Sequence, residues 1–185
     1  IVNYMVDESL KEYLKQNLKD KAKMNNEDAE VGLEIIFNYV EKDHAYTDEE
    51  RKVLIDAIDN CKILDPACGS GAFPMGVLHK LVYILNKLDP RNELWKDRQI
   101  EKINVDDPNL KERMVADVNE AFMNNELDFG RKLYLIENCI YGVDIQPIAI
   151  QISKLRFFIS LIVDQKVDNK KENLGIRSLP NLETK

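Results

Sequence analysis

The sequence predicts an α/β protein in which N-terminal helices precede a short parallel sheet of about two strands, with most residues in helices. Two segments, CKILD at 61–65 and CIYGVD at 139–144, are short apolar runs that each end in an acid, a pattern typical of buried strands. Each is followed by a segment with the apolar spacing of a helix. A strand–helix–strand–helix order indicates parallel strands joined by right-handed crossovers.

The composition is that of a globular domain, with 44% hydrophobic and 32% charged residues in a chain of 185. This length suffices for one domain with a core. No run approaches the roughly 18 apolar residues of a membrane span, and the first residues lack a signal-peptide pattern. We therefore expect a cytoplasmic protein with no membrane partner. Because the chain begins at Ile1 rather than Met, we also expect a fragment of a longer polypeptide.

Charge and cysteine content argue against several kinds of site. A net charge of −7 disfavours a broad nucleic-acid surface on these residues, because such surfaces depend on clustered Lys and Arg. Cys61, Cys68 and Cys139 form no CxxC pair, and only two histidines accompany them. Neither a metal site nor a disulfide framework is therefore predicted, and Cys61 and Cys139, which adjoin apolar runs, are expected to be small core residues.

Residues 1–60 are predicted to form an N-terminal helical segment. A polar helix over 8–24 carries a leucine every fourth residue, and 31–40 is a denser apolar helix. A third helix begins at Thr47, because Thr47-Asp48-Glu49-Glu50 fits a capping box. The apolar residues expected on the inner faces of the first and third helices are Leu10, Leu14, Leu18, Val53, Leu54, Ala57 and Ile58.

Residues 61–185 are predicted to form the second unit. A strand at 61–65 leads through a glycine-rich turn into a helix over 71–88, and residues 89–130 are a polar helical insertion anchored by Trp95. Gly130 is expected to end that insertion, and a short helix at 131–138 then leads into the strand at 139–144. The apolar stripes expected on helices are Val77, Leu78, Leu81, Leu85 and Leu88, then Leu110, Met114, Val118 and Phe122, and finally Ile148, Ile152, Leu155, Ile159 and Ile162.

The two acids that end the strands are the candidate binding residues. In parallel sheets ligands bind beyond the carboxyl ends of the strands, where Asp65 and Asp144 would both lie. Between them, Gly69 and Gly71 permit positive φ and a close approach of backbone to a ligand. The helix that follows presents free N–H groups, which favour a carboxylate or phosphate. Asp144 is placed to accept hydrogen bonds from two ribose hydroxyls.

Simpler interpretations remain for each part. Asp65 before Pro66 is also a turn former, and Asp144 before Gln146-Pro147 is also a helix cap. A nicotinamide-type dinucleotide site is disfavoured, because Pro74 stands at the third glycine position and Asp144 follows Asp65 by 79 residues, against the roughly 20 of a compact unit. A P-loop is disfavoured because no GK[ST] follows the glycines.

Two motifs carry a family resemblance. ILDPACGSGAF at 63–73 and IYGVDIQPIAIQISKLRF at 140–157 resemble the first two motifs of adenine-specific DNA methyltransferases, especially the fused type IIG restriction–modification enzymes. The resemblance implies that 61–185 is a truncated Rossmann-like methyltransferase domain that binds S-adenosyl-L-methionine. It implies these roles: Asp65 orients the loop, Asp144 binds the ribose, Ile145 packs on the cofactor's adenine, and the loop that wraps the methionine part comprises Pro66, Ala67, Cys68, Gly69 and Gly71.

The family also often has a Tyr-Thr-Pro segment before the first strand. Tyr46-Thr47-Asp48 matches it at two of three positions, so Thr47 is a further candidate at the methionine end, although the capping box explains it equally well.

One family motif has no counterpart in this sequence. The family places Asn-Pro-Pro-Tyr after the fourth strand to hold the flipped adenine, and nothing here matches it. We therefore expect no catalytic residue in this chain, no activity of the chain alone, and contact with double-stranded DNA through other parts of a longer protein. A short two-stranded sheet also leaves edges and apolar helix faces uncovered, which predicts self-association. A non-catalytic scaffold with this fold and a methyltransferase acting on another substrate are the alternatives.

Overall fold

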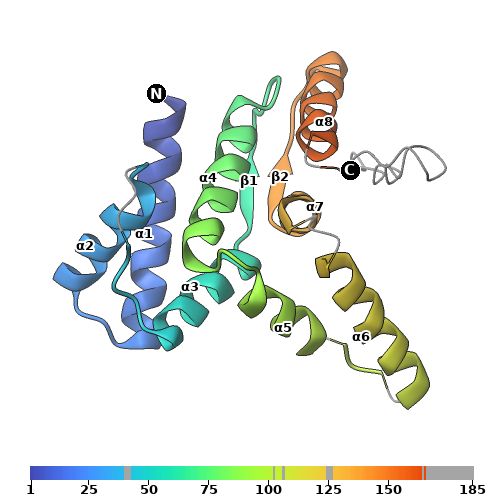
Figure 1. Cartoon of the computed structure of the whole chain (residues 1–185). Helices are drawn as coiled ribbons and strands as arrows, with labels where there is room; N and C mark the ends of the chain where they lie inside the picture. Colours follow the sequence, from blue (N-terminus) through green and yellow to red (C-terminus); the bar gives the residue numbers. More distant parts are fainter. Residues whose placement is uncertain (40–42, 102, 106, 124–126, 164, 166–185) are drawn as a thin grey trace.

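A computed structural model describes residues 1–39, 43–101, 103–105, 107–123, 127–163 and 165 of the chain. Eight helices and two strands lie within these residues (Figure 1), which confirms a mostly helical α/β fold. In chain order they are α1 Val2–Ala22, α2 Asn26–Phe37, α3 Asp48–Asn60, β1 Ile63–Asp65, α4 Ala72–Leu88, α5 Glu93–Glu101, α6 Pro108–Met123, α7 Leu127–Asn138, β2 Ile140–Gly142 and α8 Pro147–Ile162.

The two strands pair in parallel, as the sequence predicts. Ile63 lies opposite Ile140, and Asp65 lies opposite Gly142. Both strands consequently end at the same edge of the sheet, where the loop before α4 and the turn before α8 lie next to each other (Figure 1). Any ligand site built on the strand ends must lie at this edge.

The N-terminal helices pack on α4 and on one another. Leu10, Leu14 and Leu18 are at most 5% exposed, so the predicted leucine stripe of α1 is part of the core. Helix α1 begins earlier than predicted, at Val2, because Val6 (1% exposed) extends the same four-residue spacing by one turn. Helix α2 also begins earlier than expected, at Asn26, because Asn25 accepts a hydrogen bond from the Asp28 N–H and so caps it.

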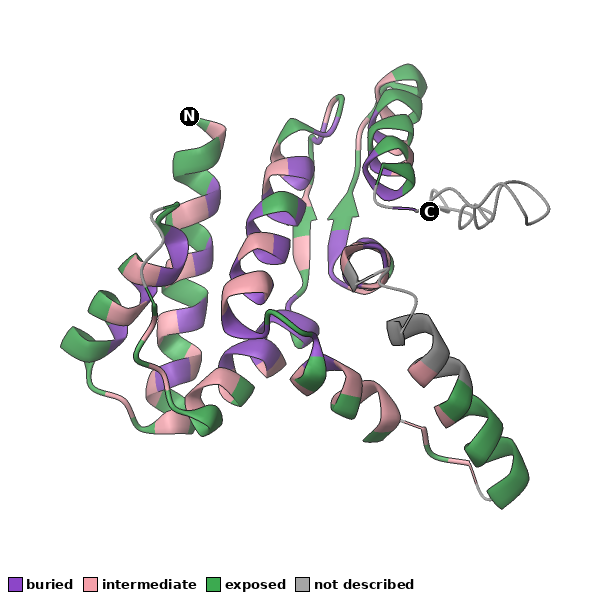
Figure 2. Ribbon diagram, in the orientation of Figure 1, coloured by how far each residue is buried: buried purple, intermediate pink, exposed green. Residues whose placement is uncertain are grey.

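Helix α4 is the central element of the fold. Its five predicted inward residues, Val77 to Leu88 at helical spacing, are all at most 1% exposed. Figure 2 shows this buried surface running along α4, between α1 on one side and the strands on the other. The position of α4 fixes the loop at residues 66–71, because that loop leads directly into its first turn.

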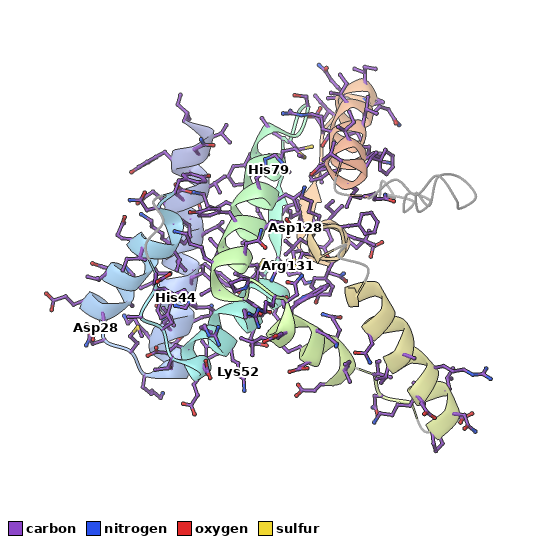
Figure 3. The ribbon with its side chains drawn as sticks, in the orientation of Figure 1. Asp28, His44, Lys52, His79, Asp128 and Arg131 are labelled. Carbon is purple, nitrogen blue, oxygen red and sulfur yellow. The ribbon has the colours of Figure 1, made fainter. Side chains whose placement is uncertain are left out.

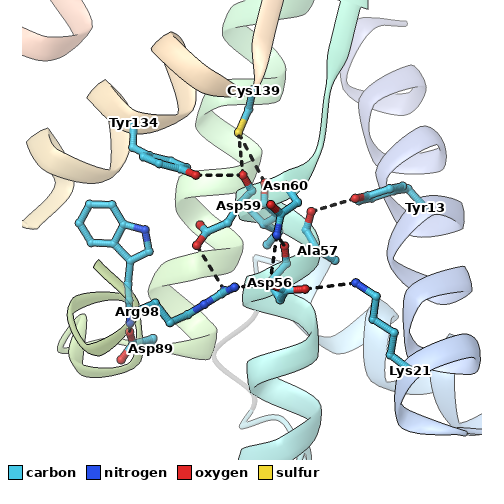
Figure 4. Close-up of polar contacts among 12 residues, drawn as sticks. Tyr13, Lys21, Asp56, Ala57, Asp59, Asn60, Asp89, Arg98, Tyr134 and Cys139 are labelled. Carbon is cyan, nitrogen blue, oxygen red and sulfur yellow. Dashed lines mark hydrogen bonds and ion pairs between the residues drawn. The ribbon is translucent and has the colours of Figure 1, made fainter. Parts of the chain in front are cut away.

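The end of α3 is bound by side chains from several elements, just before β1 begins (Figure 4). Tyr13 donates to the Ala57 carbonyl oxygen at 2.9 Å, and Tyr134 donates to the Asp59 carbonyl oxygen at 3.2 Å. The Cys139 thiol lies 3.6 Å from the same Asp59 oxygen. These contacts satisfy carbonyl groups that a helix end leaves without intrahelical partners. They also connect α1, α7 and the start of β2 to the point where β1 begins.

The predicted insertion at 89–130 consists of α5, α6 and the first turn of α7. Trp95 is 7% exposed and packs edge-on against Tyr134 at 6.0 Å between ring centroids, so it anchors this region as expected. The prediction that Gly130 ends a helix is wrong: Gly130 lies inside α7, facing the Trp95 ring. On α6, Leu110 and Met114 are exposed, while the side chains of Val118 and Phe122 lie outside the described residues.

Helix α8 presents its predicted apolar stripe to solvent. The five stripe residues, Ile148, Ile152, Leu155, Ile159 and Ile162, are 40–65% exposed. The buried face instead carries Ser153, Phe157, Ser160 and Leu161. One face of the sheet is also bare, because Leu64 and Tyr141 are 61% and 44% exposed. Apolar surface is thus uncovered where the sequence predicted it, and self-association through it stays a prediction.

A buried arginine connects α7 to α4. The Arg131 side chain is fully buried (Figure 3); it donates hydrogen bonds to the Asn86 side chain and the Asp89 carbonyl oxygen, and its Nη2 lies 3.9 Å from Asp89 Oδ2. Burial lowers the pKa of Arg131, and the carboxylates of Asp89 and Asp128 oppose that shift. Asp89 also accepts the backbone N–H groups of Glu93 and Trp95, each at 3.0 Å, so this pair fixes where α5 begins.

Replacing Arg131 with leucine is expected to lower the free energy of unfolding by about 3–5 kcal/mol, because Asp89 keeps a buried charge without its cation. Urea denaturation of Arg131→Leu beside Arg113→Leu, an exposed arginine on α6, measures this. Equal stability of the two variants would contradict the assignment.

No helix among the described residues is both long and apolar enough to cross a bilayer.

Candidate functional site

The loop after β1 and the turn after β2 are joined by main-chain hydrogen bonds. The Val143 N–H donates to the Asp65 carbonyl oxygen at 2.9 Å, and the Cys68 N–H donates to the Val143 carbonyl oxygen at 3.0 Å. The parallel ladder therefore continues past the strand ends and holds the two candidate segments together. The structure thus brings Asp65, the loop and Asp144 to one place.

The Asp144 carboxylate connects the two segments by a contact that was not predicted from the sequence. Asp144 Oδ2 accepts the Gly69 N–H and Oδ1 accepts the Gln146 N–H, both at 2.8 Å. The bond from Gln146 contributes most, followed by that from Gly69, and together they lower the pKa of Asp144 below its ordinary value. The group is therefore a carboxylate at neutral pH. An ionised carboxylate has about four acceptor positions. Accepting the N–H groups of Gly69 and Gln146 therefore leaves capacity for further donors.

The two loop glycines are needed for different reasons. Both have positive φ, 53° at Gly69 and 81° at Gly71, which other residues adopt only with strain. A Cβ at Gly69 would meet nothing within 4 Å, whereas one at Gly71 would lie 2.4 Å from Ser153 Oγ. Gly71 thus permits the close packing of α8, and Gly69 presents bare backbone to open space.

The remaining loop residues shape the turn. Asp65 Oδ1 accepts the Ala67 N–H at 3.1 Å, which matches its interpretation as a turn former around Pro66. Cys68 is buried against Gly142. Burial, and then the nearby charges of Asp65 and Asp144, raise the pKa of the Cys68 thiol. The thiol is therefore neutral at pH 7 and a poor nucleophile.

Ile145 lies beside this loop with its side chain in solvent. It is 96% exposed and directly follows Asp144, the residue whose carboxylate binds the Gly69 N–H. The edge of the sheet thus combines an exposed aliphatic side chain, two carboxylates and a glycine backbone.

Thr47 lies away from the other candidates. It forms a complete capping box, in which Glu50 N–H donates to Thr47 Oγ1 at 3.3 Å and Thr47 N–H donates to the Glu50 carboxylate at 2.8 Å. Arg51, one turn further on, donates to the Leu88 carbonyl oxygen, so this helix start lies at the C-terminal end of α4. The loop lies at the other end of α4, which is about 25 Å long at 1.5 Å per residue. The structure therefore does not bring Thr47 to the loop.

Two residues of α8 contact the loop and were not among the candidates. Arg156 Nη1 donates to the Ser70 carbonyl oxygen at 3.0 Å, and Ser153 packs on Gly71. Ser153 and Ser160 are the polar residues on the buried face of α8, and no local sequence pattern points to the contact with the loop. Among the described residues no group of three or more His, Cys, Asp or Glu side chains is arranged to hold a metal ion.

Comparison with known proteins bears on this site. Residues 138–185 match the Eco57I restriction-modification methylase family. The chain is also 30% identical over 133 residues to a protein of Methanocaldococcus jannaschii described as "Putative type II restriction enzyme and methyltransferase". The resemblance to restriction–modification methyltransferases is confirmed. Both findings relate the chain to methyltransferases of restriction–modification systems.

The aligned part covers 71% of this chain but 8% of the archaeal protein. The chain therefore spans a small part of that relative's length, and the family match covers β2, α8 and the residues after them. No solved structure matches the chain.

The two glycines are expected to respond differently to alanine. Gly69→Ala adds only the cost of a left-handed alanine, about 1–2 kcal/mol, because the methyl group enters open space. Gly71→Ala adds a clash with Ser153 and is expected to lose a further 1–3 kcal/mol or so. Urea denaturation of both variants measures the difference, and equal losses would mean that α8 does not pack on Gly71 as described.

Acid is expected to release the contact between Asp144 and the loop. Because folding lowers this pKa from its ordinary value of 3.8, the charged carboxylate stabilises the fold above that value, and the stabilisation is lost as the pH falls through the lower folded value. The melting temperature of the original protein should exceed that of Asp144→Asn from pH 7 down to about pH 4, and the gap should narrow below it. A gap that does not change with pH would contradict this assignment.

Proposed function

We propose that the edge of the sheet at residues 65–71 and 144–145 binds S-adenosyl-L-methionine, as part of a DNA adenine methyltransferase of the type IIG restriction–modification kind. The observation that supports this most is the Asp144 carboxylate, which is hydrogen-bonded to Gly69 of the loop and has acceptor capacity left. When bound, the cofactor supplies a methyl group on a positively charged sulfonium.

The residues present fit such a cofactor. Asp144 offers free acceptor positions for two ribose hydroxyls, and Ile145, which is almost fully exposed, offers an apolar face for an adenine ring. The open space at Gly69 admits the methionine part close to the loop backbone. The first turn of α4 has no side-chain cap, so its N–H groups are available to a carboxylate. The carboxylates of Asp65 and Asp144 favour a cationic ligand.

The contribution of these residues to the reaction is orientation. They would hold the methyl donor, which would supply a methyl group for the amino group of an adenine extruded from the DNA duplex, in a fixed position relative to that amine. We assign no general base at this edge, because the lowered pKa of Asp144 makes it a weak base and both carboxylates serve to hold the loop. The adenine pocket and the DNA surface are assigned to other parts of a longer protein, in the cytoplasm.

Two other functions predict different outcomes. A non-catalytic scaffold would bind no cofactor. A methyltransferase acting on cytosine, RNA or protein would bind it and modify another target, which analysis of the methylated product identifies.

Calorimetric titration of S-adenosyl-L-methionine into the full polypeptide that carries these residues tests the cofactor site. Asp144→Ala is expected to weaken binding by roughly 10–100-fold, as a hydrogen bond to a charged group is lost.

Asp107→Ala is the matched control for that titration. Asp107 accepts an N–H two residues on, from Asn109 at 2.9 Å, as Asp144 accepts that of Gln146. Both carboxylates thus bond the backbone where a helix is about to begin or has just begun. Asp107→Ala should leave cofactor affinity unchanged. No binding by the folded original protein, or equal losses in both variants, would reject the cofactor site.

A further inference from the structure

Helix α8 holds the glycine loop through two side chains that lie one turn apart. Arg156 donates to the Ser70 carbonyl oxygen at 3.0 Å across 86 positions of sequence, and Ser153 packs on Gly71. Residues three apart lie on the same face of a helix, so one face of α8 supplies both contacts.

The contact from Arg156 complements the one from Asp144. Asp144 accepts the N–H of Gly69, and Arg156 donates to the carbonyl oxygen of Ser70. The two side chains therefore hold the peptide units on either side of the bond that links Gly69 to Ser70. Within the part of the chain that the structure describes, that central peptide has one weak contact, a 3.8 Å approach of Cys68 Sγ to the Gly69 oxygen. It is also the backbone next to the open space at Gly69.

Fixing these peptides matters because glycines on both sides of Ser70 give the loop a wide choice of conformations. When only a fraction of the protein has the loop in the binding conformation, the apparent affinity for the ligand is reduced to that fraction of its full value. Side-chain bonds that select one conformation before the ligand arrives remove that loss.

We propose that Arg156 is a positioning residue for the cofactor loop: its hydrogen bond to Ser70, together with the bond from Asp144 to Gly69, sets the loop in its binding conformation before the cofactor arrives. The cofactor's identity rests on the proposed function, whereas the setting of the loop does not. The guanidinium is exposed, and exposed charged contacts add little to the stability of a fold. Its effect on the loop is thus separable from an effect on folding.

Hydrogen exchange of individual amides in the ligand-free protein tests the positioning. Arg156→Met should speed exchange of the Gly69 amide about tenfold, while the Val143 amide of the strand extension keeps its rate. Arg156→Lys, which retains a donor, should restore part of the protection. Lys154→Met is the matched control, because it removes a cation from the same turn of α8 and should change neither rate.

Calorimetry on the same variants connects the loop to binding. Arg156→Met should weaken S-adenosyl-L-methionine binding by about tenfold with little change in melting temperature. Weaker binding with unchanged Gly69 exchange would overturn the proposal and make Arg156 a direct ligand contact. A uniform rise in exchange across α4 and both strands would overturn it in favour of a structural role.

The two proposals fail separately. If the original protein binds no cofactor, the proposed function fails, yet faster Gly69 exchange in Arg156→Met still supports the positioning of the loop. If cofactor binds and Arg156→Met changes neither exchange nor affinity, the positioning role fails alone.

Discussion

Two three-residue strands paired in parallel determine where every candidate residue lies. The pairing of Asp65 with Gly142 brings together segments that are far apart in the chain, and its main-chain bonds continue through Val143 to Cys68. So short a pair is not stable by itself. It depends on α4, which covers one face, and on the bonds from α1, α7 and Cys139 at the end of α3. The helical core thus holds the strands, and the strands hold the loop.

Much of this fold follows from local features that the sequence displays. The acid-ended apolar runs predicted both strands, and Thr47 with Glu50 predicted the start of α3, because a strand pattern and a capping box depend on neighbouring residues. Features that depend on distant partners were not predicted. The spacing of apolar residues in α8 shows that the helix has an apolar face, but not which face is covered. Glycine is common at helix ends, but Gly130 lies within α7 and packs on Trp95.

In the candidate site, too, local features were predicted and contacts between distant residues were not. The order of the motifs placed Asp65 and Asp144 at one sheet edge, and a family resemblance assigned their roles. The bond from Asp144 to Gly69 spans 75 positions and that from Arg156 to Ser70 spans 86, so neither has a local signature. Thr47 shows the reverse case: its motif matches locally, yet the length of α4 separates it from the loop.

The close approach of α8 to the loop explains why a small polar residue, Ser153, lies on the inner face of this helix. Gly71 approaches so closely that Ser153 already fills the space a Cβ would need, and a bulky aliphatic side chain at 153 would push the helix away from the loop. A small polar residue is therefore required on the inner face, and Arg156 on the same side reaches Ser70 only while that close approach is kept. The five residues of the predicted apolar stripe lie on the outer face, whereas Phe157 and Leu161 are buried on the inner one. The apolar spacing of the stripe residues therefore marks a surface of α8 that no described element covers. It does not mark the face of α8 that contacts the loop.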